Sequence, residues 1–495
     1  MRKPEDMFDR DYEWAELVRF ATYTGPEPTL GVVSGRRRQG KTFLLDALCR
    51  QAGGFYFAAT EATEAESLRQ FGAALERWTR SPVSFRFAHW EEAISAVMAL
   101  AGQRAATAGP LPVVLDEFPF LVKASPELPS LLQRALGPAA RRDGGPVRLL
   151  LCGSALSFMG NLLTGTAPLR GRASLELVVP TLDYRLARRF WGITDHKLAV
   201  LVDAVVGGTP AYAREFTLGD SPADLDDFGP WVTRNVLNPS RPLFREARFL
   251  LAEEPDIRDT ALYHGVLSAI AEGNHTRGGI AGYLGRKSTD LGHPLTVLED
   301  SGMVDRQPDA FHAKRSAYRI AEPIVTFYHA IMRPRWSDLE RPGHADTVWN
   351  DAQPTFRSKV IGPHFEHLCR TWARWYATPD TLGGTRTRIA SGTVPDPAAK
   401  TKHELGVVAF GTRADAPGAR EGILAIGEAK WNEVIGTGHL ARLTHIRALL
   451  TTRDRTAALA RLVLFSGAGF TDELHHTAST DPGIQLIDLE HLYEH

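Results

Sequence analysis

The stretch LGVVSGRRRQGKT, residues 30–42, decides the class of fold. Its first five residues, Leu30–Ser34, form a short apolar run that is typical of a buried strand. The following eight match the pattern G-x-x-x-x-G-K-[ST], and a helical pattern covers Thr42–Arg50. A strand, a glycine-rich loop and a helix in this order are the context that the P-loop pattern requires. The sequence therefore predicts a phosphate-binding loop.

The residue types in this loop explain how it would bind a nucleotide. Glycines let the backbone curl so that its N–H groups point at phosphate oxygens, and the helix N-terminus adds a favourable dipole. Lys41 is expected to neutralise the β and γ phosphates, and Thr42 to offer its hydroxyl to Mg²⁺. We thus expect ATP and Mg²⁺ as ligands, with phosphate contacts from Gly35, Arg36, Arg37, Arg38, Gln39, Gly40, Lys41 and Thr42.

A second strand carries the acidic partners of the loop. PVVLDE at residues 112–117 is an apolar run that ends in two carboxylates. Asp116 is predicted to hold Mg²⁺, directly or through water, and Glu117 to act as the general base that activates the attacking water. The alternative is a buried strand whose acidic end faces solvent.

Three further residues are candidates for contact with the γ-phosphate. Ser154 follows the predicted strand Val147–Cys152, where it would sense the phosphate or simply cap a helix. Arg170 and Arg172 follow a glycine-rich turn. Either would supply positive charge to the transition state, from the same chain or from a neighbouring subunit, and the alternative is two solvated arginines.

The pattern along the chain predicts an α/β fold. Apolar runs alternate with helical stretches in residues 1–180, which indicates a mostly parallel sheet, the P-loop ATPase core. Residues 181–260 are expected to form a helical lid, and 261–335, three helices and a hairpin, a winged-helix-like segment. Residues 333–351 are expected to form a linker at the start of a final α/β domain, 336–495, with a polar loop over 411–422.

The composition is that of an ordinary globular protein. The 495 residues carry a formal net charge of −1, so the whole chain offers no electrostatic attraction for nucleic acid. The three cysteines, Cys49, Cys152 and Cys369, form neither a disulfide framework nor a zinc cluster and are expected in the core. No stretch reaches the ~18–20 apolar residues that span a bilayer, and a cytoplasmic protein without a membrane partner is predicted.

An ordered set of motifs resembles the archaeal-type P-loop ATPases of the AAA/STAND-like superfamily. The set comprises the segments FDRDYE (8–13), the P-loop, LDEF (115–118), CGS (152–154), PLRGR (168–172) and GGTPAY (207–212). The resemblance implies a winged-helix segment and a C-terminal PD-(D/E)xK domain, which has a restriction-endonuclease-like fold. It also implies that Gly208 and Pro210 lie near the nucleotide and couple its state to domain arrangement, although a helix-breaking turn explains them equally.

The C-terminal domain departs from the nuclease pattern. Glu428 and Lys430 end an apolar strand on one face, a geometry that suits metal-dependent phosphodiester hydrolysis. The resemblance adds Glu366 on a helix, and it implies a metal-binding aspartate where this chain has Gly406. Glu404 shares that face and would replace the acid only in a shifted site. We therefore expect a nuclease-like fold with impaired or absent cleavage, because a lost carboxylate weakens metal binding.

These features together favour an ATP-driven molecular switch or motor. The alternatives are an active ATP-dependent DNA nuclease of a defence or mobile-element system, and a nucleotide-gated DNA-binding regulator. DNA and a second copy of the chain are the candidate macromolecular partners.

Overall fold

The computed structural model describes residues 1–137, 145–254, 257, 259–413 and 420–494. Of the loop expected over 411–422, residues 414–419 lie outside this set, while residues 411–413 and Gly422 belong to strands. The chain divides into two compact units, which are described separately. Unit 1 comprises Met1–Thr181 with Thr209–Ala211, and unit 2 comprises Leu182–Gly208 with Tyr212–His495.

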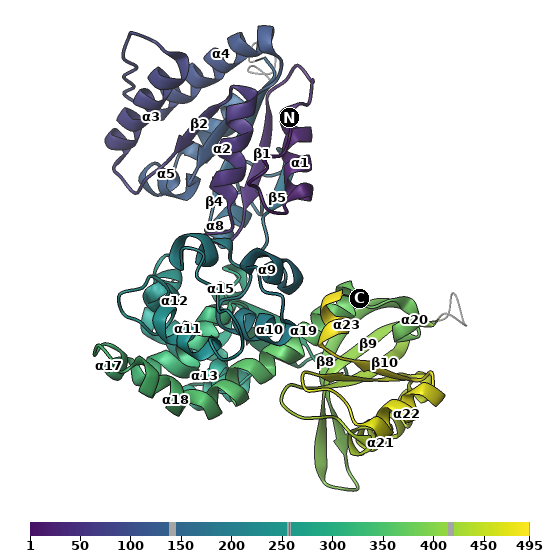
Figure 1. Cartoon of the computed structure of the whole chain (residues 1–495). Coiled ribbons are helices and arrows are strands. Elements are labelled where there is room, and N and C mark those ends of the chain that lie inside the picture. The colour runs from purple at the N-terminus through teal and green to yellow at the C-terminus, as the bar shows by residue number, and fades with distance from the viewer. Residues whose placement is uncertain (138–144, 255–256, 258, 414–419, 495) are drawn as a thin grey trace. The chain divides into compact units, whose positions relative to one another are not determined.

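Unit 1 is built on a five-stranded sheet in the order β2-β3-β4-β1-β5 (Figure 1). Every neighbouring pair is parallel, as the alternation of strands and helices predicted. The strands are β1 Thr29–Ser34, β2 Phe55–Ala58, β3 Leu111–Asp116, β4 Val147–Gly153 and β5 Ala173–Val178.

Helices cover both faces of this sheet because its strands are apolar on both sides. On β3, Val114 packs with the core of α1 and α2, while Val113 and Leu115 pack with the core of α3 to α6. The helices of the unit are α1 Asp11–Ala21, α2 Lys41–Ala52, α3 Glu64–Thr79, α4 Trp90–Ala108, α5 Phe118–Ala124, α6 Leu128–Ala135 and α8 Leu156–Asn161.

Unit 2 begins with helices that share one core. After them, the helices α13, α14 and α15 and the antiparallel hairpin β6–β7 follow in the predicted order. The assignment of this segment as a winged helix stays a prediction. The elements are α9 Tyr184–Trp191, α10 His196–Val206, α11 Phe228–Asn235, α12 Leu243–Ala252, α13 Thr260–Ala271, α14 Arg277–Leu284, α15 Gly292–Asp300, β6 Val304–Pro308, β7 Ser316–Ile320 and α16 Pro323–Phe327.

The prediction of a linker over residues 333–351 is wrong. The segment is mainly helical, with α17 at Trp336–Leu339 and α18 at Ala345–Thr355. Its proline, arginine and aspartate content suggested a linker, but Leu339, Val348 and Trp349 are buried in the unit's core. Trp349 stacks edge-on with neighbouring aromatic rings, so packing overrides the polar composition.

The C-terminal part of unit 2 contains a mixed sheet in the order β12-β11-β10-β9-β8. β8, β9 and β10 pair antiparallel, whereas β10, β11 and β12 pair parallel. The strands are β8 Gly384–Asp396, β9 Thr401–Arg413, β10 Gly422–Lys430, β11 Arg461–Ser466 and β12 Ile484–Ile487. The sequence predicted the three central strands but neither edge strand, because β8 and β12 lack a continuous apolar run.

Two long helices pack on opposite faces of this mixed sheet. Phe365 and Leu368 of α19 belong to one core, and Leu443 and Ile446 of α21 belong to the other. The helices of this region are α19 Gly362–Trp375, α20 Pro379–Leu382, α21 Thr437–Thr451, α22 Asp472–Thr480 and α23 Leu489–Glu494.

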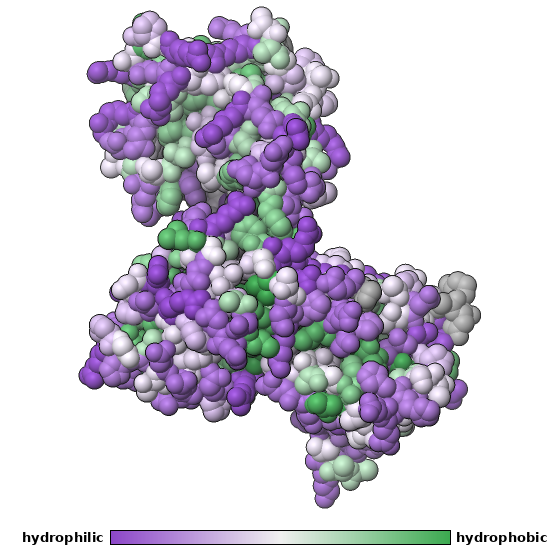
Figure 2. Space-filling model, in the orientation of Figure 1, coloured by the Kyte–Doolittle hydropathy of each residue, from purple (hydrophilic) through white to green (hydrophobic). Residues whose placement is uncertain are grey.

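The cysteines and the helices bear on two expectations from composition. All three cysteines are buried and unpaired, as expected. In the part of the chain that the structure describes, no helix has the length and apolarity to cross a membrane. The face in Figure 2 is largely hydrophilic, with apolar residues scattered between polar ones.

Candidate functional site

The loop between β1 and α2 depends on two glycines. Gly35 has φ +149°, and a Cβ at this position would stand 2.4 Å from the carbonyl oxygen of Val179. Gly40 has φ +85° and caps the N-terminus of α2. Since side chains rarely adopt this backbone conformation and the first site has no room for one, the curled path of the loop requires glycine at both ends.

Lys41 is buried inside the curl of the loop. Its Nζ donates hydrogen bonds of 2.7 Å to the carbonyl oxygens of Gly35 and Arg36. Burial lowers the pKa of Lys41, and the neighbouring Cys152, Glu117 and Asp116 oppose that shift. The ammonium group therefore lies at the position where phosphates would meet the backbone N–H groups of the loop.

Asp116 organises the acidic side of the site. Its Oδ2 accepts hydrogen bonds from Thr42 Oγ1 at 2.8 Å and Tyr56 Oη at 2.6 Å, and its Oδ1 accepts from the Glu117 N–H at 2.9 Å. The parallel sheet brings these groups together, because β1 and β3 flank β4 and all three end at the same edge. The motifs identified Thr42 and Asp116; Tyr56 on β2 lies in no motif and was missed.

Glu117 and Ser154 meet at the ends of β3 and β4. Ser154 Oγ donates to Glu117 Oε2 at 3.3 Å, and α8 is capped by Ala155 rather than by this serine. Burial and the charge of Asp116 raise the pKa of Glu117, while Arg37 and Lys41 partly oppose the shift. A raised pKa makes the Glu117 carboxylate more basic, which is the direction that a general base requires.

Arg10 supports the loop from the N-terminal segment and was not predicted as a site residue. It is 6% exposed, and its guanidinium donates to the carbonyl oxygens of Pro180 at 2.8 Å and Gln39 at 3.4 Å. Glu13 accepts from the same guanidinium at 3.1 Å. A buried arginine with this many acceptors holds backbone in place. The only signal in the sequence was its position in the segment 8–13.

The Gly-Gly-Thr-Pro segment contacts the P-loop through its threonine. Gln39 Nε2 donates to Thr209 Oγ1 at 3.1 Å, and both side chains are buried within unit 1. Gly208 accepts a hydrogen bond from the Leu182 N–H at 3.0 Å, and a Cβ on it would overlap the Leu182 carbonyl. The sequence pointed to Gly208 and Pro210, while the side chain that reaches the loop belongs to the residue between them.

Arg170 and Arg172 follow α8. Arg170 is exposed, and its guanidinium donates to the carbonyl oxygen of Gly165 at 2.8 Å. Arg172 is half-buried. A role for either in charge stabilisation stays a prediction.

A second cluster surrounds Gly406 in the C-terminal sheet. A Cβ at this position would stand 3.7 Å from the carboxylate of Glu366 on α19, and Arg370 donates to the Gly406 carbonyl oxygen at 3.0 Å. Glu428 at the end of β10 is 5% exposed and forms ion pairs with Lys430, at 3.3 Å, and with Arg442 of α21. The position of the predicted acid, Gly406, therefore lies beside Glu366 but carries no carboxylate.

The charges in this cluster act on one another. Burial raises the pKa of Glu366; Arg370 and Lys430 lower it, and Glu404 and Glu428 raise it further. Among the described residues, however, the three glutamates do not form a group whose ligand atoms all lie within 4.8 Å. The nuclease-like residues are thus neighbours, but their carboxylates are not gathered at one point.

No protein-family model matches the chain. The uncharacterized protein MJECL04 of Methanocaldococcus jannaschii is 26% identical over 313 residues, 62% of this chain and 65% of that protein. The match thus spans less than two thirds of the relative.

Similar solved structures include three archaeal proteins. They are the Walker-type ATPase PABY2304 of Pyrococcus abyssi (18% identity, TM-score 0.47, 66% of this chain and 97% of that one), the ORC2 protein of Aeropyrum pernix (15%, 0.42, 71% and 97%) and its ORC1 protein in complex with DNA (15%, 0.32, 68% and 95%). TM-scores below 0.5 do not establish a shared fold.

Proposed function

We propose that this chain binds ATP at the P-loop of unit 1 and hydrolyses it as a molecular switch. The observation that carries the proposal is the 2.8 Å hydrogen bond between Thr42 and Asp116, from two motifs 74 residues apart in the chain. It supports the assignment because a chance glycine-rich turn would not bring a hydroxyl and a buried carboxylate together beside Lys41.

The donor set fits a magnesium ion. Thr42 and Asp116 offer hard oxygen ligands, which Mg²⁺ prefers, and the bound ion would neutralise charge on the phosphates. Lys41 would bind phosphate oxygens with its ammonium group. Glu117 Oε2 would accept a proton from the attacking water while Ser154 orients the carboxylate. Gln39 and Thr209 would pass a change in the loop to the Gly-Gly-Thr-Pro segment.

The Thr42→Ala substitution tests the metal side of this site. It removes the hydroxyl that would bind Mg²⁺ and that holds Asp116. We expect ATP affinity in the presence of Mg²⁺ to fall about 10–100-fold, and affinity measured in EDTA to stay unchanged. Thr42→Ser, which keeps the hydroxyl, should retain both values. Equal losses with and without Mg²⁺, measured by calorimetry, would contradict the assignment.

We also propose that the nuclease-like domain of this chain does not cleave DNA. Support comes from Gly406 at the expected acid position and from Glu428, whose Oε1 forms ion pairs with Lys430 and Arg442. An active DNA nuclease and a nucleotide-gated DNA-binding regulator remain the alternatives.

Gly406→Asp is expected to restore the missing acid. A Cβ at this position has ordinary contact distance to Glu366, so the first atom of the new side chain meets no backbone. We predict Mn²⁺-dependent cleavage of linear DNA that rises at least about 10-fold above the wild-type level, because two carboxylates would then share a metal ion. Gly406→Ala, which adds only the Cβ, is the matched control.

The same cleavage assay, applied to further variants, discriminates between these alternatives. Adding Glu428→Ala to Gly406→Asp should abolish the gained cleavage. If the wild-type chain already cleaves DNA and Glu428→Ala removes that activity, the domain is an active nuclease. Salt-sensitive DNA binding without cleavage in every variant would favour the regulator.

A further inference from the structure

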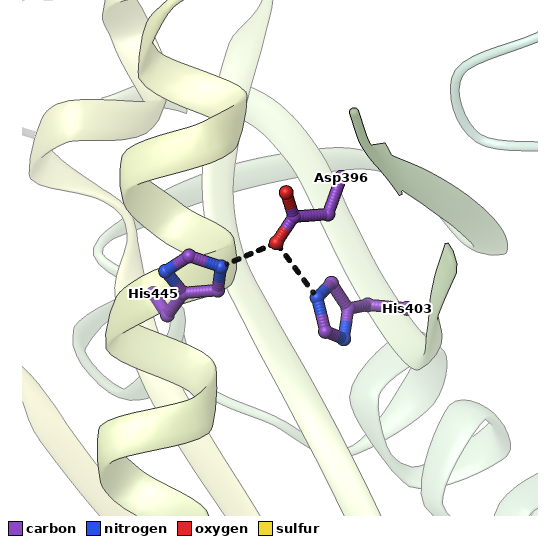
Figure 3. Close-up of side chains that lie close together, drawn as sticks. All are labelled: Asp396, His403 and His445. Atoms are coloured by element: carbon purple, nitrogen blue, oxygen red, sulfur yellow. Dashed lines mark hydrogen bonds and ion pairs between the residues drawn. The ribbon is translucent and has the colours of Figure 1, made fainter. Parts of the chain in front are cut away.

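Two histidines and an aspartate meet outside both sites described above. Asp396 ends β8, His403 lies on β9, and His445 lies on α21 (Figure 3). Their ligand atoms all lie within 4.8 Å of one another. None of the three belongs to the P-loop motifs or to the nuclease-like residues, so the proposed function leaves this cluster unexplained.

The hairpin register brings the first two residues onto one face. Asp396 pairs with Thr401, and Val394 pairs with His403, so Asp396 and His403 are diagonal neighbours across the two strands. α21 packs on this face, with Leu443 and Ile446 in a core shared with Val394. His445, between those two helical residues, then reaches the hairpin from the helix edge.

The distances suit coordination of one ion. His445 Nε2 lies 2.8 Å and His403 Nε2 3.5 Å from the same carboxylate oxygen, Asp396 Oδ2. Ligands at about 2.0–2.1 Å around a tetrahedral zinc ion are separated by about 3.3 Å, which lies between these two values. Small rotations of the imidazoles would therefore seat a metal ion among the three atoms.

A backbone N–H group fixes the orientation of the Asp396 carboxylate. The other oxygen of Asp396, Oδ1, accepts a hydrogen bond of 3.1 Å from the Ala399 N–H in the turn between β8 and β9. Such an outer partner orients a ligating group. The Asp396 side chain is 3% exposed, whereas that of His445 is 53% exposed, so the cluster is anchored in the protein and open toward solvent.

We propose that Asp396, His403 and His445 bind a divalent transition-metal ion of the zinc class. Two imidazole nitrogens and one carboxylate oxygen favour such an ion over Mg²⁺ or Ca²⁺, which prefer oxygen ligands alone. Three protein ligands and an open side leave one coordination position for water or an anionic ligand. Each histidine would bind through Nε2 as neutral imidazole with its remaining proton on Nδ1.

Zinc titration of the full-length, chelator-treated chain tests this proposal. Calorimetry should show one tightly bound Zn²⁺ per chain, and Co²⁺ should give the visible absorption bands of a low-coordinate site. His445→Ala and His403→Ala should each weaken Zn²⁺ binding by about 100-fold or more, because one of three ligands is lost. His476→Ala removes an exposed histidine of the same region and should leave binding unchanged.

Control measurements separate this site from the others. Circular dichroism should show a folded His445→Ala chain, since this side chain is half-exposed. Lys41→Ala and Glu428→Ala should retain wild-type zinc affinity, so failure of the ATP or nuclease proposals does not bear on this one. Absence of stoichiometric Zn²⁺ binding, or binding that persists in both histidine variants, overturns the proposal and leaves a hydrogen-bonded network. Displacement of Zn²⁺ by millimolar Mg²⁺ would contradict the proposal that the site prefers ions of the zinc class.

Discussion

Lys41→Ala is expected to abolish ATP binding. In the structure the Lys41 ammonium is buried and donates to two carbonyl oxygens of its own loop, at 2.7 Å each. A bound nucleotide would offer phosphate oxygens to the same group, and charged hydrogen bonds contribute about 1.5–3 kcal/mol each. Losing two of them should weaken binding by about 100-fold or more. Fluorescence titration with a labelled ATP analogue measures the effect.

The control for this variant is Lys123→Ala in the same unit. The Lys123 side chain is 68% exposed and pairs with Glu61 on the surface, so its loss should leave ATP affinity unchanged. Thermal unfolding of both variants checks that the fold is intact. Wild-type affinity in a folded Lys41→Ala chain would show that the loop at residues 35–42 is not the nucleotide site.

Glu117→Gln is expected to separate hydrolysis from binding. The amide keeps the size of the side chain and can still contact Ser154, but it cannot accept a proton from water. General-base catalysis contributes about 10²–10⁴-fold, so the rate of ATP hydrolysis should fall by that factor while ATP affinity stays within a few-fold of wild type. Single-turnover hydrolysis and equilibrium binding, measured on the same preparation, check both parts.

The pH dependence adds an independent readout. Burial and Asp116 raise the pKa of Glu117, so the wild-type carboxylate takes up a proton at a higher pH than an ordinary glutamate. Hydrolysis should therefore decline on acidification through that raised pKa, and the decline should be absent in Glu117→Gln. Glu127→Gln, an exposed glutamate nearby, serves as the control. A Glu117→Gln chain that hydrolyses ATP at the wild-type rate would exclude this residue as the base.

The two units differ in how far sequence patterns predicted them. Strands β1, β3 and β4 could be predicted because each is a short apolar run between helical stretches, and burial on both faces makes that pattern strong. The edge strands β2 and β5 have shorter apolar runs and are partly exposed. The edge strands β8 and β12 lack the pattern. Composition predicts a linker over residues 333–351 because it does not report that Leu339, Val348 and Trp349 are buried in the core of the unit.

The residues of the candidate nucleotide site also differ in how far sequence patterns predicted them. Gly35, Lys41, Thr42 and Asp116 were predictable because each lies in a contiguous motif with its own strand. Tyr56, Arg10 and Thr209 contact the same site through hydrogen bonds between residues far apart in the chain. Tyr56 lies in no motif, and the motif segments 8–13 and 207–212 do not indicate that Arg10 and Thr209 reach the loop.

The amino-acid sequence by itself determined the curled P-loop after β1. Consecutive residues set that conformation, with glycine at positions 35 and 40, where φ is positive. Only the tertiary structure decided that Ser154 lies against Glu117 and that Asp396, His403 and His445 form a cluster. Strand order and helix packing join residues that are remote in the chain, and local patterns do not encode either.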